Sequence, residues 1–128
     1  MENPTHPIQT YLSVAIGGAI GSVIRFAISQ TLHRINPDHP YLAVASVNVV
    51  GSFLIGLLAG HFTDRTQPLY LFAAIGILGG FTTFSSLSLD LLTHFQKGQA
   101  AHAIINALLQ IALGLIVAAI GFNLTNRM

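Results

Sequence analysis

Four long runs of apolar residues follow one another along the chain, and short polar segments separate them. The runs cover about residues 11–31, 42–62, 69–92 and 101–124. Each run has about the 20 residues that a helix needs to cross the hydrocarbon core of a bilayer. The runs are continuous, whereas the strands of a membrane β-barrel alternate apolar and polar residues. The pattern therefore predicts an all-α membrane protein with four transmembrane helices.

The connections between the runs are short and contain residues that end helices. Pro37 and Pro40 lie in the first connection, and Gly98 lies in the third. Connections of this length place successive helices side by side and antiparallel. We therefore expect residues 1–128 to form a single transmembrane domain.

The composition supports the lipid bilayer as the solvent and excludes several classes of function. Only 7% of residues are charged and 52% are hydrophobic, whereas soluble domains carry about 25% charged residues. The net charge of +1 and the lack of a basic run argue against nucleic acid as a partner. Cysteine is absent, which excludes disulfides and thiolate chemistry. Residues 1–10 contain no lysine or arginine, so we expect no cleavable signal peptide.

Glycines recur at the spacing of helix contacts. Three GxxxG pairs occur in the first three runs: Gly17 with Gly21, Gly56 with Gly60, and Gly76 with Gly80. Such pairs let helix backbones approach closely in a membrane. Packing within the chain accounts for any one pair. Three pairs in four helices leave glycine faces to spare, which favours an oligomer.

Lysine and arginine are spread evenly over the two membrane faces. Arg65 and Arg127 lie on one face, and Arg34 and Lys97 lie on the other, with Arg25 near a helix end. The positive-inside rule therefore gives no preferred orientation. We hypothesise an antiparallel, dual-topology homodimer, in which two copies insert in opposite orientations.

The third run contains the strongest indication of a site. Gly79 and Gly80 are followed by five hydroxyl residues within seven positions, between Thr82 and Ser88. Such a sequence is a poor continuous helix, and we expect a break near mid-membrane, at Gly79 to Thr83. Freed carbonyls at a break attract a cation, and the start of the next half-helix attracts an anion. Phe84, beside the break, either packs or offers its positive ring edge to an anion.

Four further polar side chains lie inside the runs, where each is costly unless it faces protein or water. Asn48 either bonds a neighbouring helix or donates its amide to an anion that has shed water. Asn106 and Gln110 are four residues apart on one helix face and are candidates for a polar path. Arg25 either extends to the interface or lines the mouth of an aqueous vestibule.

The remaining ionisable residues predict no catalysis. We expect Asp90, near the end of its helix, to cap the helix or extend to the interface. The six histidines lie in connections or at helix ends without metal-binding spacing. No combination of a nucleophile with a base, or of two carboxylates, lies at one depth. The sequence therefore predicts no enzyme.

Three segments resemble the signatures of a known family. They are Gly17–Phe26 (GGAIGSVIRF), Asn48–Gly56 (NVVGSFLIG) and Gly79–Ser85 (GGFTTFS). Together they resemble the Fluc (CrcB) fluoride channels, four-helix proteins that export cytoplasmic fluoride across the bacterial inner membrane. The resemblance covers nearly the whole chain in length, order of the runs and placement of the motifs.

The resemblance implies an antiparallel homodimer with two fluoride pores and a structural Na+ at its centre. The Na+ would be held by the backbone carbonyls at Gly79 and Thr82, and Arg25 would stand in the vestibule. The positions that match pore residues or suit fluoride are Asn48, Thr83, Phe84, Ser86, Leu87, Ser88, Asn106 and Gln110.

The sequence departs from the family pattern at several of these places. Leu87 stands where the family has a second phenylalanine, and Gly114 and Ala118 stand where hydroxyl residues are common. Two alternatives to the channel therefore remain. One is a non-conducting or heterodimer-forming structural subunit. The other, a small multidrug-type exporter, needs a membrane-embedded carboxylate, which the first run lacks.

Overall fold

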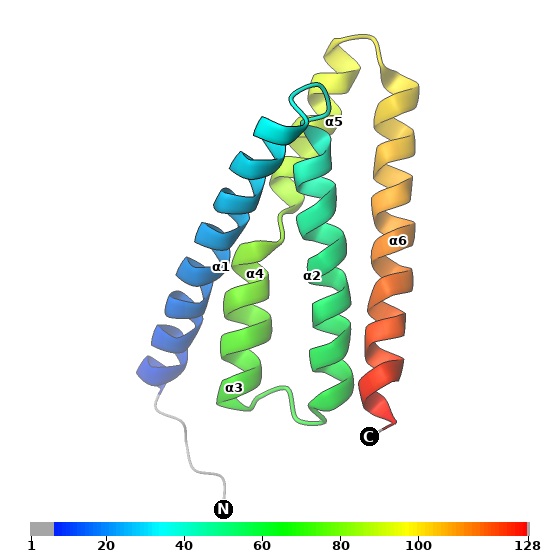
Figure 1. The fold of residues 1–128 in the computed structure, drawn as a ribbon. Helices are drawn as coiled ribbons and strands as arrows, with labels where there is room; N and C mark the ends of the chain where they lie inside the picture. Colours follow the sequence, from blue (N-terminus) through cyan, green and yellow to red (C-terminus); the bar gives the residue numbers. More distant parts are fainter. Residues whose placement is uncertain (1–6, 128) are drawn as a thin grey trace, which may run out of the picture.

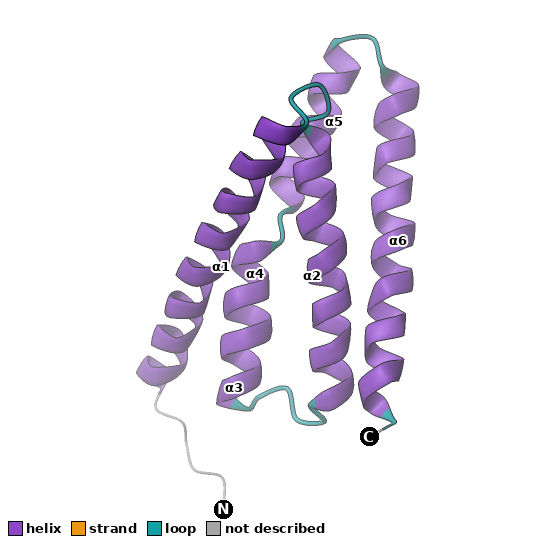
Figure 2. Ribbon diagram, in the orientation of Figure 1, coloured by secondary structure: helices purple, strands orange, loops and turns teal. Residues whose placement is uncertain are grey.

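The computed structural model describes residues 7–127 and is helical throughout this range except for short connections. Four segments are long and apolar enough to cross a membrane. They are α1 (Pro7–Ile35), α2 (Tyr41–His61), a broken third span (Pro68–Gln96) and α6 (Ala100–Asn126). Figures 1 and 2 show them as one bundle of alternating direction. The predicted all-α protein with four spans is confirmed. The prediction about a signal peptide concerns residues 1–10, of which 1–6 lie outside the described residues.

The third span consists of four helical pieces and one extended step. The pieces are α3 (Pro68–Tyr70), the π-helix η1 (Leu71–Leu78), α4 (Gly79–Phe81) and α5 (Phe84–Gln96). Between α4 and α5 the backbone of Thr82 and Thr83 is extended, which appears in Figure 2 as a loop inside the bundle. The break is therefore narrower than the predicted Gly79 to Thr83.

The position of the break follows from capping rather than from the two glycines. A glycine weakens a helix by only about 1 kcal/mol, and both glycines stay helical in α4. Thr83, in contrast, is the N-cap of α5, and its hydroxyl accepts a hydrogen bond from the N–H of Ser86 at 3.2 Å. An N-cap residue needs an extended backbone, so α5 begins anew after Thr83.

The glycine pairs are used for packing within the chain. A Cβ at Gly21 would clash with the carbonyl oxygen of Ile77, and one at Gly56 with that of Ala118. Gly76 and Gly80 in turn face α1. These contacts join α1 to the third span and α2 to α6. The inference that spare glycine faces favour an oligomer is therefore wrong, because the folded chain itself occupies them.

The connections lie at two opposite ends of the bundle (Figure 1). The α1–α2 and α5–α6 connections share one end, and the α2–α3 connection and the C-terminal end of α6 share the other. In the α2–α3 connection, Asp64 accepts hydrogen bonds from the N–H and hydroxyl of Thr66, at 2.9 and 2.6 Å. These bonds lower the pKa of Asp64.

Candidate functional site

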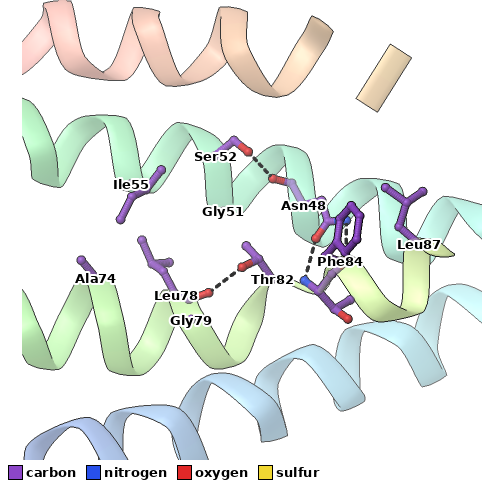
Figure 3. A pocket seen from close by; sticks show the side chains of 11 residues that line it. Asn48, Gly51, Ser52, Ile55, Ala74, Leu78, Gly79, Thr82, Phe84 and Leu87 are labelled. Atoms are coloured by element: carbon purple, nitrogen blue, oxygen red, sulfur yellow. Dashed lines mark hydrogen bonds between the residues drawn. The ribbon is translucent and has the colours of Figure 1, made fainter. Parts of the chain in front are cut away.

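The break in the third span is held by a side chain from α2. Asn48 Oδ1 accepts a hydrogen bond from the N–H of Thr83 at 2.8 Å, and Asn48 Nδ2 donates to the Thr83 carbonyl at 3.0 Å (Figure 3). One amide thus satisfies both backbone groups of the extended residue, as a neighbouring strand would. A continuous α-helix would direct the Thr83 N–H to the carbonyl of Gly79. The carbonyl of Gly79 therefore lacks its helical donor. The two hydrogen bonds with Asn48, in turn, satisfy the unwound backbone of Thr83, which allows it to lie inside a membrane-spanning segment.

A line of buried amides continues from Asn48 into α6. Asn48 Nδ2 also donates to Gln110 Oε1 at 3.1 Å, and Gln110 Nε2 donates to Asn106 Oδ1 at 3.1 Å. Asn106 and Gln110 are only 8% and 7% exposed. The Nδ2 atom of Asn106 is buried without a hydrogen-bond partner. Both N–H groups of Asn48 are thus engaged, whereas Asn106 Nδ2 has no hydrogen-bond partner and Gln110 Nε2 uses one of its two N–H groups.

The hydroxyl groups near the break mostly bond to the backbone or to one another. The Thr83 hydroxyl donates to Ser86 Oγ at 3.2 Å, and that of Ser88, an exposed residue, donates to the Phe84 carbonyl at 3.1 Å. Ser52, which the sequence analysis did not single out, donates to the carbonyl of Asn48 at 2.7 Å. Its position one helical turn after Asn48 was a signal that could have identified it.

A cavity of about 340 Å³ lies beside the break. Its wall brings together six of the residues selected from sequence: Asn48, Gly79, Thr82, Thr83, Phe84 and Leu87. Phe84 is 81% exposed, whereas Leu87 is only 8% exposed. The other selected residues lie outside this wall: Arg25, Ser86, Ser88, Asn106 and Gln110. Gly51 and Ser52 of α2 complete the polar part of the lining.

Arg25 lies half-buried in the bundle and contacts the end of α4. Its Nε donates to the carbonyl of Gly80 at 3.0 Å. This carbonyl belongs to the last turn before the break, where helix carbonyls have no partner in the helix. A positive charge there is also favoured by the helix dipole. Of the two sequence expectations for Arg25, extension to the interface is wrong, because the side chain bonds inward.

Replacing Arg25 with methionine tests this contact. Methionine keeps the apolar stem but leaves the Gly80 carbonyl without a donor, so we expect unfolding in SDS to become easier by about 1–3 kcal/mol. Arg34→Met is the matched control, because Arg34 is exposed in the last turn of the same helix. Equal stability of the two variants would show that the contact with Gly80 contributes nothing.

Asp90 lies inside α5 rather than at its end, so the expectation that it caps the helix is wrong. Its Oδ2 atom is buried without a hydrogen-bond partner, and the residue lines a second cavity with His94 and His102. One oxygen of the carboxylate is therefore buried, whereas the residue as a whole is half-exposed, and extension to the interface stays a prediction. Within residues 7–127 no group of three or more His, Cys, Asp or Glu residues is arranged to hold a metal ion.

The break offers unpaired backbone groups of both signs at one place. The carbonyl of Gly79 lacks its helical donor, and the N–H groups of Phe84 and Ser85 open α5, where they have no partner in the helix. Such half-helix ends inside a membrane bind ions through backbone groups. The cavity beside them is lined mainly by apolar side chains, and its polar lining residues are Asn48, Ser52, Thr82 and Thr83. Half-helix ends beside such a cavity are typical of a small membrane transport protein.

Comparison with known proteins agrees with this class. Residues 12–122 match the family described as CrcB-like protein, Camphor Resistance (CrcB). A protein of Azotobacter vinelandii named fluoride-specific ion channel FluC is 44% identical over 92% of this chain and 98% of its own length. A protein of the same name from Thermus thermophilus is 39% identical over 91% of this chain and 94% of its own length. Another from Pseudomonas fluorescens is 40% identical over 92% of this chain and 98% of its own length. The chain therefore belongs to the CrcB/FluC family of fluoride channels, which are not enzymes.

Proposed function

We propose that this protein is a fluoride-selective channel through which cytoplasmic fluoride leaves passively across the bacterial inner membrane. The observation that carries the proposal is the similarity over nearly the full length to proteins named fluoride-specific ion channels. The geometry of the break supports it, because an ion site made of neutral groups suits this anion.

Fluoride is small and strongly hydrated, so a pore must replace its water with several donors without trapping it. The N-terminal end of α5 supplies a partial positive charge and unpaired N–H groups. The exposed ring of Phe84 stands at this end and offers its positive edge. The hydroxyl of Ser86 and the free N–H of Asn106 are further neutral donors. The hydroxyls of Thr83 and Ser88 become donors to fluoride only when they release the oxygens to which they now donate.

In this mechanism Asn48 acts mainly by holding the site open. Its amide bonds both backbone groups of Thr83, which fixes the direction in which α5 begins. Through Gln110 it also ties the break to α6. A donor hydrogen bond from Asn48 to passing fluoride requires that one of these bonds open transiently.

We infer that the working unit is an antiparallel homodimer with two pores. Four helices are too few to enclose a pore, and the cavity beside the break opens on the surface of the bundle next to Phe84. A second copy packed there would complete its wall. Arg65 and Arg127 at one end balance Arg34 and Lys97 at the other, so either orientation satisfies the positive-inside rule.

The residues of the break also fit a structural Na+. The carbonyl of Gly79 lacks its helical donor, and a Cβ on this glycine would have no atom from another part of the chain within 4 Å. Unwound backbone carbonyls are the groups that coordinate Na+ at broken membrane helices. We infer that the carbonyls of Gly79 and Thr82 would hold the ion between two copies, where its charge would offset the negative ends of two half-helices.

A second candidate function rests on Leu87, which is buried and has no ring edge to offer. If fluoride conduction requires a second phenyl ring at position 87, the protein is a structural subunit that does not conduct as a homodimer. The exporter alternative has no comparable support, because α1 contains no carboxylate and the chain belongs to a channel family.

A fluoride electrode on liposomes containing the purified protein separates these candidates. We expect efflux of fluoride but not of chloride from the wild type. We expect a further increase with Leu87→Phe, because the added ring reaches the cavity that residue 87 lines. A wild type without efflux, joined by an active Leu87→Phe, would favour the structural subunit. No efflux from either would reject the channel.

A further inference from the structure

A second cluster of titratable side chains lies at the end of the bundle that holds the α1–α2 and α5–α6 connections. His94 of α5 and His102 of α6 stack with ring centroids 4.3 Å apart and planes at 19°. Tyr41 of α2 meets both rings edge-on, at 5.8 and 4.8 Å. With Asp90 these residues line a cavity of about 470 Å³. Side chains from three helices thus form one aromatic and ionisable cluster.

Two buried atoms of this cluster have no hydrogen-bond partner: Asp90 Oδ2 and His102 Nε2. A buried polar atom without a partner is costly. His94 is joined to its own helix through Nδ1, 2.7 Å from the Asp90 carbonyl. Asp90, His94 and His102 line one cavity, so a proton taken up by an imidazole would place a cation in the same cavity as the Asp90 carboxylate. The cluster therefore combines the groups that a proton-binding site needs.

The charges around the cluster balance while its histidines are neutral. Two acidic residues, Asp38 and Asp90, line the cavity, and Lys97 lines it from the α5–α6 connection. Arg34 stands in the last turn of α1, which ends in the adjoining connection. The histidines here are His33, His39, His94 and His102. Protonation of any of these histidines would therefore give this end of the bundle a net positive charge.

The stacked rings accept one proton more readily than two. Two imidazolium rings with centroids 4.3 Å apart would repel each other strongly. The proton on the pair therefore belongs to both rings as a coupled unit. The loop histidine His39 contacts Tyr41 and is free of this restriction.

The cluster is continuous with the amide line that leads to the break. His102, Asn106 and Gln110 follow one another at four-residue spacing on one face of α6, and Gln110 bonds Asn48. We call the end of the bundle around His102 the mouth of this line of amides. A positive charge at the mouth would concentrate anions at the start of the line.

We propose that Asp90, His94 and His102 form a proton-binding site whose protonation makes this mouth cationic and speeds fluoride entry as the pH falls. The effect on flux rests on the proposed channel function, whereas proton binding does not.

The first test measures protonation of the wild type by NMR of histidine labelled with ¹⁵N and ¹³C in its ring, in lipid nanodiscs between pH 8 and 5. We expect His94 and His102 together to gain about one proton over the range in which the exposed His61 gains one of its own. In His94→Gln, His102 alone should gain a full proton. Complete protonation of both rings in the wild type, in step with His61, would overturn the proton-binding site.

The second test measures fluoride efflux from liposomes at pH 7.5 and 5.5, after subtraction of the leak from protein-free liposomes. We expect the wild-type rate to rise by about threefold at low salt, and the rise to shrink as salt screens the mouth. The double variant His94→Gln/His102→Gln should show a smaller rise, because only His33 and His39 can then still add positive charge at this end, while His61→Gln, at the other end of α2, should keep the full rise. A rise of wild-type size in the double variant would overturn the link to flux. No efflux at either pH would reject the channel, and the NMR result would still stand.

Discussion

We expect fluoride efflux from liposomes to fall to the level of protein-free liposomes when Asn48 is replaced with aspartate. The carboxylate keeps an acceptor for the Thr83 N–H but loses the two donors that now bond the Thr83 carbonyl and Gln110 Oε1. A charged oxygen would then face two acceptors in a part-buried position, which costs about 1–3 kcal/mol or more. We expect the extended backbone at Thr83 to lose its support, and the fixed negative charge beside it to repel fluoride. A fluoride electrode measures the loss.

Asn123→Asp is the matched control for this substitution. Asn123 is exposed on α6 and its amide bonds only to the Ala119 carbonyl of its own helix, so we expect efflux close to the wild type. Gel filtration of both variants shows whether they fold. If Asn48→Asp folds and conducts like the wild type, Asn48 does not hold the site as proposed.

Replacing Gly21 with alanine should disrupt the bundle more than any conservative change at its surface. A Cβ at this position overlaps the carbonyl oxygen of Ile77, which is backbone and has no rotamer to change. Helix α1 must therefore move away from the third span, and the Arg25 contact with Gly80 moves with it. We expect a loss of about 1–3 kcal/mol or more in the free energy of unfolding, together with slower fluoride efflux. Unfolding in SDS followed by circular dichroism measures the first effect.

Gly18→Ala on the same helix separates the contact from helix propensity. The nearest atom to a Cβ at Gly18 is the Gly76 carbonyl oxygen at 3.9 Å, an ordinary van der Waals distance. Alanine also favours the helix by about 1 kcal/mol relative to glycine. We therefore expect Gly18→Ala to be neutral or stabilising. Similar losses in both variants would mean that close approach at Gly21 is not what holds α1.

The sequence was a good guide to the spans and a partial guide to the break. Hydropathy located all four helices. The first, third and fourth spans extend beyond their apolar runs at both ends, because polar residues can continue a helix in the interface, whereas α2 matches its run to within one residue at each end. The hydroxyl-rich segment indicated a break. The two glycines made the predicted break too wide, because both stay helical in α4 and Thr83, as the N-cap, decides where α5 begins. The π-helix at Leu71–Leu78 has no signal in the sequence that we can identify.

The site residues show the same division. Sequence identified Asn48, Asn106 and Gln110 as costly polar groups that must face inward, and Gln110 bonds both Asn48 and Asn106 in the bundle. It did not identify their partners. Asn48 bonds Thr83, 35 residues away, and Arg25 bonds Gly80, 55 residues away. Contacts at such separation depend on how helices pack, which residue spacing along one helix does not contain.

The sequence by itself determined that this chain is a four-helix membrane protein with an interruption in its third helix. Lipid imposes those features on each residue, because a segment that crosses it needs apolar side chains and backbone groups that are hydrogen-bonded within the protein. Only the tertiary structure decided how the glycine faces, the amide line and the histidine pair are used. Each depends on which helix lies opposite, and close packing of backbones selects that neighbour. The glycines suggested a second copy from sequence alone, and the fold assigns them to the chain itself.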